Sequence, residues 1–272
     1  MTRSKIYWNT LCCLLSVHLI SAQGRQLDDL DDENVGVGIG NARQEKELYK
    51  GFSGFHLFSN ATQRVYHHDL TIAVVEITRN NTLMNCELIE VFNDEQQHEA
   101  LRNLTIQISK PIRVTFNEIM ELMSRCGRLD QNLINRRIAA TLHKPPVDQP
   151  ESETTQSSIL SGIVPGTKWC GTGDIAKTYF DLGSEVTMDK CCRAHDLCPV
   201  KVRGYSARYN LTNESLYTKS HCSCDDELLK CLRSSNKPAA NFMANIYFNI
   251  LRIPCIVDEK EGKKRFRSAK RF

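Results

Sequence analysis

The chain has 272 residues, of which 41% are hydrophobic, an ordinary composition for soluble globular material that can bury a core in one or two domains. Its 35 basic and 32 acidic residues leave a net charge of +3, which is too small to indicate a nucleic-acid-binding protein, and no motif supports that class. No stretch reaches the roughly 20 consecutive apolar residues that a membrane-spanning helix needs.

The first segment has the layout of a cleavable secretory signal. Arg3 and Lys5 precede an apolar run that ends in the small residues Ser21 and Ala22. We therefore expect a signal peptide over residues 1–22 and a secreted, extracellular protein. Sequons for N-glycosylation fit the same compartment and predict a glycoprotein; they lie at Asn60, Asn80, Asn103, Asn210 and Asn213.

Export changes the meaning of the cysteines, because thiols outside the cytosol pair into disulfide frameworks. Two of the 12 cysteines, Cys12 and Cys13, belong to the signal segment. Cys86 and Cys126 lie in the first half, and their pairing follows only from the even count. The others crowd together near the end, at Cys170, Cys191, Cys192, Cys198, Cys222, Cys224, Cys231 and Cys255.

Residues 23–142 are predicted to form a mixed α/β region of undefined fold. Residues 28–41 are acidic and glycine-rich, which predicts flexibility. Alternating β-branched residues on either side of Asn80 predict a hairpin within residues 65–92. Apolar residues at helical spacing predict a helix over residues 114–126. No constellation of chemically active side chains stands out in this region.

Residues 143–161 have the proline-rich, polar composition of a linker. Just before it, Arg136 and Arg137 are either a processing site or solvated surface. Residues 1–161 carry 16 basic and 20 acidic residues, whereas residues 162–272 carry 19 and 12. This opposite charge predicts either a basic region that meets anionic surfaces or attraction between the two halves of the chain.

The final region begins with a glycine-rich loop over residues 162–174, followed by three predicted helices over residues 187–198, 222–232 and 238–251. On the first helix Cys191 and His195 share a face, and Asp196 lies on the neighbouring one. Cysteine bridges to the second helix would clamp the two helices antiparallel and bring His195 toward Asp225, and an imidazole held by a carboxylate is a competent general base.

Three interpretations of "CCRAHDLCP" stay open on spacing alone. It is a disulfide staple with an incidental histidine, a zinc site, or a catalytic site. Zinc is disfavoured, because the adjacent Cys191 and Cys192 of an exported chain are expected to be oxidised.

The segments "WCGTGD", "DKCCRAHDLCP", "CSCDDELLKCL" and "IYFNIL..PC" occur in the order and spacing of bee-venom-type (group III) secreted phospholipases A2, which this part of the chain resembles. The resemblance implies a mainly α, disulfide-stapled phospholipase A2 fold over residues 162–256, with two antiparallel core helices, a calcium loop and a third helix. It also implies calcium-dependent hydrolysis of the sn-2 ester of phosphoglycerides, to a lysophospholipid and a free fatty acid, at a phospholipid membrane surface.

The resemblance further implies the site residues. His195 corresponds to the general base, Asp225 to the carboxylate that orients it, and Tyr247 to the tyrosine behind this pair. The Ca²⁺ ligands are the Asp196 carboxylate and the backbone carbonyls of Trp169, Gly171 and Gly173, an oxygen set that suits a hard cation. The implied disulfides are Cys170–Cys192, Cys191–Cys231, Cys198–Cys224 and Cys222–Cys255. No G-x-S-x-G motif for a serine nucleophile is present.

Several alternatives remain. Outside the family, Tyr247 is a packing aromatic, and the Trp169 side chain is either a loop plug or an interfacial anchor. His221 is expected at the surface, and Asp226 is expected to be a charge near a helix N-terminus. The basic tail, residues 257–272, either binds anionic lipid, is trimmed, or is solvated.

The region before the linker, residues 23–142, is hypothesised to be a propeptide or accessory domain that contacts the catalytic region and holds it in check. The alternative function for the whole chain is a catalytically silent phospholipase-like protein that acts by binding a receptor or a membrane.

Overall fold

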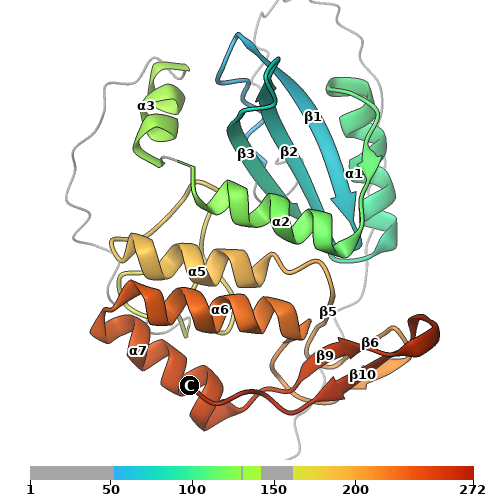
Figure 1. Cartoon of the computed structure of the whole chain (residues 1–272), viewed down its shortest axis with the longest axis vertical. Coiled ribbons are helices and arrows are strands. Elements are labelled where there is room, and N and C mark those ends of the chain that lie inside the picture. Colours follow the sequence, from blue (N-terminus) through green and yellow to red (C-terminus); the bar gives the residue numbers. More distant parts are fainter. Residues whose placement is uncertain (1–51, 130, 142–161) are drawn as a thin grey trace, which may run out of the picture. The chain divides into compact units, whose positions relative to one another are not determined.

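The N-terminal region contains a four-stranded sheet with the strand order β3-β2-β1-β4. The computed structural model describes residues 52–129, 131–141 and 162–272 (Figure 1). The predicted signal peptide, the acidic segment and the linker lie outside these residues. Three strands are antiparallel and a fourth joins β1 in parallel; they are β1 (Ala61–His68), β2 (Thr71–Thr78), β3 (Leu83–Glu90) and β4 (Ile112–Arg113).

The predicted hairpin around Asn80 is the β2–β3 pair. Asn81 takes the left-handed backbone conformation at φ 58° that this turn requires, and Asp69 does the same at φ 46° between β1 and β2. β1 is therefore an additional strand that extends the hairpin into a meander.

Both faces of β2 are covered by helices, so residues 72–75 within it are apolar on both faces. On one face Ile72 and Val74 pack with Leu104 of α1 (Asp94–Gln107). On the other face Ala73 and Val75 belong to the cluster that contains Ile119 of α2 (Phe116–Gly127).

The predicted helix over residues 114–126 is α2. It begins at a capping box in which Thr115 and Glu118 exchange side-chain and backbone hydrogen bonds. The Cys86–Cys126 disulfide ties its end to β3. Neither α1 nor α3 (Gln131–Thr141) is apparent from the apolar spacing, because both helices are mostly polar.

The C-terminal region is built on helices that correspond to the three predicted ones. They are α5 (Val186–Asp196), α6 (Cys222–Ser235) and α7 (Pro238–Ala244), the last of which continues as a π-helical segment η1 (Asn245–Leu251). Asn236 ends α6 in the left-handed conformation, and Pro238 occupies the first turn of α7.

Four disulfides hold this region together, and they are the pairs that the resemblance implies: Cys170–Cys192, Cys191–Cys231, Cys198–Cys224 and Cys222–Cys255. Cys191 in α5 joins a residue late in α6, whereas Cys198, just after α5, joins a residue early in α6. The two helices therefore run side by side in opposite directions (Figure 1).

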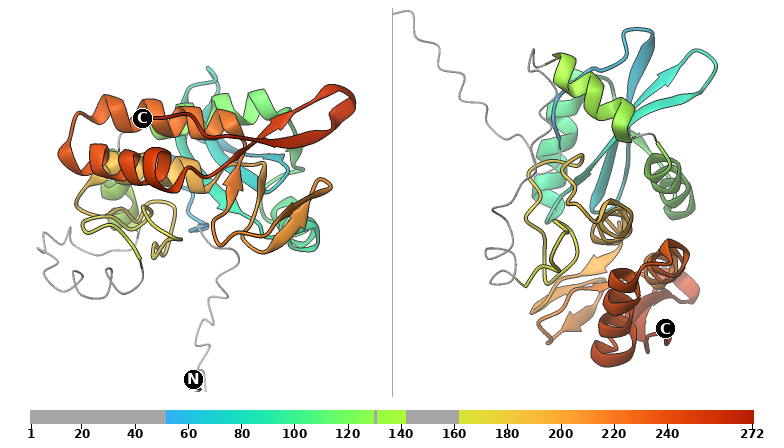
Figure 2. Two further views of the ribbon diagram at one scale, coloured as in Figure 1. Left: turned by 90° about the horizontal axis from the view of Figure 1, so that it is seen from below. Right: turned by 90° about the vertical axis from the view of Figure 1, so that its left-hand side faces the viewer.

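Short strand pairs complete the C-terminal region. They are β5 (Lys201–Val202) with β8 (Lys219–Ser220), β6 (Ser206–Arg208) with β7 (Leu211–Asn213), and β9 (Cys255–Asp258) with β10 (Lys264–Arg267), the last pair joined by the short helix η2 (Lys260–Gly262). The β9–β10 hairpin projects from the helical layer in the left view of Figure 2.

The basic tail is ordered and partly neutralised within the chain. Lys264 pairs with Asp258, Arg265 pairs with Glu259 at 2.7 Å, and Lys270 pairs with Asp226 of α6 at 2.8 Å. The backbone N–H of Phe272 donates to Asn249 at 3.0 Å. These ion pairs leave fewer cations available for anionic lipid than the sequence alone indicates.

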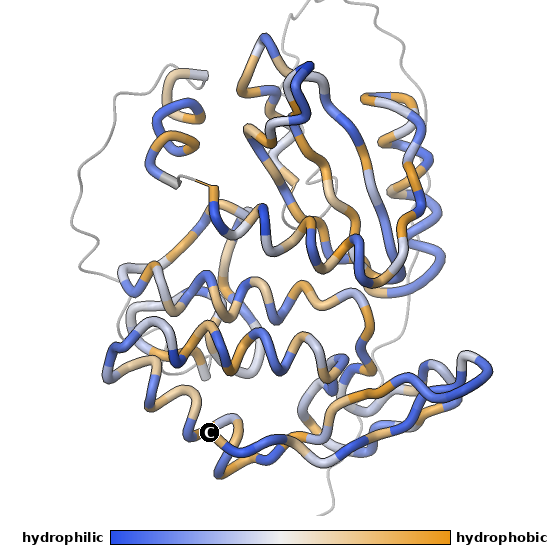
Figure 3. The backbone as a smooth tube through the Cα atoms, in the orientation of Figure 1, coloured by the Kyte–Doolittle hydropathy of each residue, from blue (hydrophilic) through white to orange (hydrophobic). Residues whose placement is uncertain are grey.

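The described residues from Phe52 onward belong to one compact unit, and one apolar cluster continues from the sheet through α2 into α5 and α6. α2 packs against β1 and β3 on one side and α5 on the other (Figure 1). Figure 3 shows apolar residues along β2, α2 and α5, the elements that contribute to this shared interior. Among the residues described, no helix combines the length and the hydropathy that crossing a membrane requires.

Candidate active site

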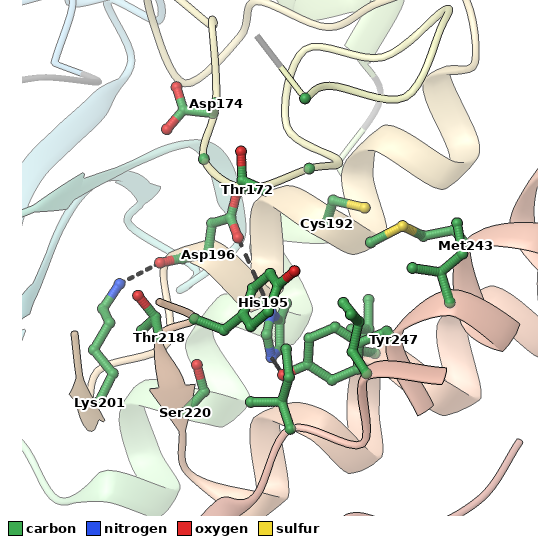
Figure 4. Close-up of a pocket in the computed structure, with 18 of the residues that line it drawn as sticks. Thr172, Asp174, Cys192, His195, Asp196, Lys201, Thr218, Ser220, Met243 and Tyr247 are labelled. Carbon is green, nitrogen blue, oxygen red and sulfur yellow. Dashed lines mark hydrogen bonds and ion pairs between the residues drawn. The ribbon is translucent and has the colours of Figure 1, made fainter. Parts of the chain in front are cut away.

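A pocket of about 370 Å³ opens beside α5 and α6, and His195 and Asp196 line it (Figure 4). One side is polar, with Lys201, Thr218 and Ser220, and the other is apolar, with Met243 and Tyr247. A pocket with one polar and one apolar side suits an amphiphilic ligand.

His195, near the end of α5, is held by residues of two other helices. Its Nε2 atom lies 2.8 Å from Oδ1 of Asp225, which is buried in the first turn of α6. An ionised carboxylate can only accept, so Nε2 carries the proton and Nδ1 is the free acceptor of the neutral ring. Nδ1 lies on the side of Asp196, 4.0 Å from its Oδ1 atom.

Tyr247 of η1 completes this cluster. Its hydroxyl donates to Asp225 Oδ1 at 3.3 Å and lies 3.3 Å from His195 Nε2, and its ring packs edge-on against the imidazole. Burial, and then the Asp225 carboxylate, hold the pKa of the Tyr247 phenol well above its ordinary value, so the phenol stays a hydrogen-bond donor. Tyr247 thus orients the carboxylate as well as packing against it.

The glycine-rich loop lies along the same pocket. Gly171 and Gly173 line it together with Asp196, while Trp169 is buried behind the loop. A Cβ atom at Gly171 would lie 2.4 Å from the carbonyl oxygen of Gly162, so only glycine permits this close approach of two backbone segments.

This donor set fits a calcium ion. The Asp196 carboxylate and loop carbonyls are oxygen ligands, which Ca²⁺ prefers. Within residues 52–129, 131–141 and 162–272, no three His, Cys, Asp or Glu side chains converge on a metal position. A cation here would therefore depend on backbone carbonyls as much as on the carboxylate of Asp196.

Asp189, on the buried side of α5, was not apparent as a site residue from the sequence. Its carboxylate accepts from the backbone N–H groups of Lys168, Trp169 and Gly183 at 2.8 to 3.0 Å. Burial raises the pKa of this carboxyl, although these backbone donors oppose the shift. Asp189 therefore fastens the glycine-rich loop to the helix that carries His195 and Asp196.

Glu90, at the end of β3, also lines the pocket, although the N-terminal sequence gave no indication of such a role. Its Oε1 atom lies 2.5 Å from Lys201 Nζ and 2.7 Å from a terminal nitrogen of Arg203. No local sequence signal links residues that are 111 and 113 positions apart. Glu90 was therefore not among the site residues predicted from the sequence.

Two other side chains have defined positions. The Trp169 indole is 3% exposed and donates to the carbonyl of Asp181, so it plugs the loop and is not an interfacial anchor. His221 was expected at the surface, and this is wrong. It is buried, accepts from the Ser223 N–H as the N-cap of α6, and packs against the Phe116 ring at 4.4 Å.

Comparison with known proteins identifies the family. The family model for phospholipase A2 matches residues 163–259. Phospholipase A2 isozymes of Heloderma suspectum are 40% identical over 101 residues, which cover 37% of this chain and 71% of theirs. A phospholipase A2 of Bombus terrestris is 40% identical over 94 residues, 34% of this chain and 69% of its own.

A group 3 secretory phospholipase A2 of Bos taurus is 41% identical over 98 residues, but these are 36% of this chain and only 20% of the bovine protein. The family match begins at residue 163, after the sheet and its helices. The chain therefore belongs to the phospholipase A2 family, on the side of the bee-venom-type (group III) secreted enzymes.

Proposed function

We propose that this chain is a secreted, calcium-dependent phospholipase A2 in which His195 is the general base. One observation carries the proposal: the His195 Nε2 atom is bonded to Asp225 at 2.8 Å, which leaves Nδ1 on the pocket side of the ring. An imidazole fixed in one tautomer by a buried carboxylate is suited to take a proton from water.

The proposed reaction starts with a water molecule at Nδ1 of His195. The imidazole removes a proton from the water as its oxygen attacks the carbonyl carbon of the sn-2 ester. Asp225 stabilises the imidazolium that forms, and Tyr247 holds Asp225 in place. When the ester C–O bond breaks, His195 returns the proton to the departing glycerol oxygen, giving a lysophospholipid and a fatty acid.

Ca²⁺ would be held by Asp196 and the carbonyls of Trp169, Gly171 and Gly173, and when bound it supplies positive charge for the lipid phosphate and for the oxyanion of the transition state. These residues support the proposal because a carboxylate and two of the loop glycines line the pocket of His195. Trp169 would contribute only its backbone carbonyl, since its side chain is enclosed.

We further propose that the apolar end of the pocket faces the bilayer. Phe242 and Ile250 are 60% and 71% exposed and lie four residues on either side of Ile246, which lines the pocket. This spacing places the three side chains along one side of the α7–η1 segment. An exposed apolar stripe at the entrance is suited to contact lipid.

Export and the contact between the two regions of the chain belong to the same proposal. The disulfides and the secretory relatives support an extracellular location. Ion pairs between Glu90 and Lys201, and between Asp69 and Arg208, support a lasting association of residues 52–141 with the catalytic region.

The test is hydrolysis of phospholipid vesicles labelled in the sn-2 chain by the full-length secreted protein, with calcium and with EDTA. Release of labelled fatty acid in calcium, lost in EDTA and restored when calcium is added back, is expected. Absence of hydrolysis with retained vesicle binding would contradict the proposal and support the catalytically silent alternative.

A further inference from the structure

The lipid pocket is completed by a residue from outside the part of the chain that matches phospholipases A2. Glu90 ends β3 of the N-terminal sheet and lines the same pocket as His195 and Asp196. The family match begins at residue 163, so the catalytic machinery implied by the relatives does not include this carboxylate.

Glu90 forms ion pairs with two cations on the polar wall of the pocket. One oxygen of its carboxylate contacts both Lys201 and Arg203, at 2.5 and 2.7 Å. Burial alone would raise the pKa of the Glu90 carboxyl, but the Lys201 ammonium and the Arg203 guanidinium hold it below its ordinary value. Glu90 is therefore ionised at neutral pH and offsets one of the two positive charges.

These contacts are largely withdrawn from water, so their charges are weakly screened. The side chains of Lys201 and Glu90 are 3% and 10% exposed, and Arg203 is 28% exposed and stacks over the Phe92 ring at 4.1 Å. Lys201 also donates to the backbone carbonyl of Asp196. Figure 4 shows Lys201 on the Asp196 side of the pocket, away from Met243 and Tyr247.

Position and charge together indicate which part of a lipid would meet this wall. Acyl chains require the apolar side, so the polar groups of the lipid are left with the side of Asp196 and Lys201. An exposed pair of cations there would bind a second negative charge in the headgroup, whereas a carboxylate attracts an ammonium and repels an anion.

We infer that Glu90 is a specificity-determining residue that shifts the selection of the pocket away from anionic headgroups and toward zwitterionic headgroups with a terminal ammonium. The inference rests on the proposed phospholipase A2 function. It assigns the N-terminal region a part in substrate selection and makes it more than a cover for the catalytic region.

The experiment is a competition between a phosphatidylcholine and a phosphatidylglycerol in the same mixed vesicles, hydrolysed by the full-length protein. Both lipids share one surface, so differences in vesicle binding cancel in the ratio of their kcat/KM values. Glu90→Gln keeps an oxygen that can accept from Lys201 but removes the charge. We expect it to shift the ratio toward phosphatidylglycerol by about tenfold, the order expected for one unit charge in a partly desolvated site.

The control is Asp94→Asn. Asp94 also forms an ion pair with the other region, with Arg208 at 2.7 Å, but its side chain is 67% exposed and it does not line the pocket. The ratio of the kcat/KM values on the two lipids should be the same for Asp94→Asn as for the wild type. An unchanged ratio in Glu90→Gln, or an equal loss of rate on both lipids, would overturn the inference.

A second variant keeps the test decisive if Glu90→Gln folds poorly. Arg203→Gln removes one cation while Lys201 remains paired with Glu90, so the ratio should move toward phosphatidylcholine, and an unchanged ratio would overturn the inference. Failure of the proposed function is a separate outcome, because the wild-type protein would then hydrolyse neither lipid in calcium.

Discussion

At the scale of single residues, the proposed chemistry depends on the two nitrogens of His195 having different surroundings. Nε2 contacts Asp225 and Tyr247, which lie on different helices, whereas Nδ1 faces the pocket. The carboxylate and the phenol orient the ring without occupying the nitrogen that would meet water. A general base needs one nitrogen that faces the pocket in a fixed orientation, and a histidine that only packs in the core does not have one.

His195→Gln should lower the rate of phospholipid hydrolysis by at least about 10³-fold, because glutamine cannot take up the proton. Calcium binding should be nearly unchanged, since His195 contributes no ligand. Hydrolysis assays and calcium titration by calorimetry measure the two effects. His98→Gln, at an exposed position on α1, is the control. Turnover like that of the wild type in His195→Gln would remove His195 as the base.

Single residues also show where a sequence motif is insufficient. The five sequons look alike in the sequence, but the Asn213 side chain is fully buried, and its amide nitrogen donates to the carbonyls of Val202, Arg203 and Tyr217. A glycan on that nitrogen is incompatible with these hydrogen bonds. Asn60, Asn80 and Asn210 are exposed and remain predicted acceptors.

At the scale of elements, α5 connects His195, the proposed base, to the glycine-rich loop. Its one side carries His195 and Asp196 toward the pocket, and its buried side carries Asp189 against the loop backbone. The positions of loop carbonyls and of the carboxylate are thereby coupled through one rigid helix. Arg193 supports the same arrangement by donating to the carbonyl of Tyr179 and lying over its ring at 3.8 Å.

Asp189→Asn should weaken calcium binding by about 10- to 100-fold, the usual cost of losing a group that orients metal ligands. In this variant an NH₂ group replaces one carboxylate oxygen, and it would face backbone N–H donors that need an acceptor. The calcium dependence of hydrolysis should shift accordingly, while added calcium restores most of the maximal rate. Asp226→Asn, at a carboxylate of α6 that pairs with Lys270 and does not line the pocket, should shift neither. An unaltered calcium requirement in Asp189→Asn would contradict this role.

One buried carboxyl group of the sheet has a pKa far from its ordinary value. Glu87 of β3 is buried and accepts from the backbone N–H and hydroxyl of Ser53 at 2.6 and 2.7 Å. Burial raises the pKa of its carboxyl from 4.5 to about 7, and the nearby Glu76 adds to the shift, while the Ser53 donors oppose it. Burial raises the pKa of the Tyr179 phenol, across the shared interior, and the charge of Glu87 adds to this shift.

Because the pKa of Glu87 is raised on folding, its contribution to stability is fully present below pH 4.5 and is lost as the pH rises through about 7. The loss is on the order of 3 kcal/mol. Glu87→Gln should remove this loss. Between pH 5 and pH 8 the unfolding free energy of the wild type should therefore fall relative to that of the variant. Urea unfolding at both pH values measures the gain, with the exposed Glu95→Gln as control. Equal pH dependence in Glu87→Gln and the wild type would refute the assignment.

Local signals predicted the elements that carry the site, but not the contacts between distant ones. Pro199 marks the end of the first C-terminal helix and Pro238 the first turn of the third, and the β2–β3 hairpin follows from the β-branched residues on either side of Asn80. The residues of the pocket wall were predictable only within residues 162–256, where the family resemblance applies. Glu90 and Asp189 act through burial and through partners elsewhere in the chain, and neither burial nor such pairing has a signature in a single sequence.

At the scale of the whole molecule, the two regions share an interior and exchange polar contacts. Thr71 donates to the carbonyl of Leu197 at 2.7 Å, and the Leu70 N–H donates to that of Pro199 at 3.1 Å. Arg208 pairs with Asp69 and Asp94 at 2.7 Å. Two acidic residues of the N-terminal region therefore form ion pairs with one basic residue of the C-terminal region.

The dibasic pair before the linker lies within α3, and Arg137 stacks over the Phe58 ring at 5.1 Å. Proteases bind substrates in extended form, so cleavage at this pair would require local unfolding of the helix. Residues 143–161, whose sequence has the composition of a linker, are therefore chosen for an engineered cut.

A cut in the linker distinguishes a detachable propeptide from a permanent part of the enzyme. None of the five described disulfides joins the two regions, so the pieces would be held only by packing and polar contacts. Separation would expose the shared apolar cluster and leave Lys201 without its carboxylate, and unpairing a buried ion pair costs about 3–5 kcal/mol.

With a specific protease site placed in residues 143–161, the two pieces should therefore co-elute in gel filtration at 0.15 and at 1 M salt, since buried pairs are weakly screened. They should separate in urea without reductant. The headgroup preference and the hydrolysis rate should be those of the uncut protein, because Glu90 stays in the pocket wall. Dissociation of the pieces with a rise in the rate would instead identify residues 23–142 as an inhibitory propeptide.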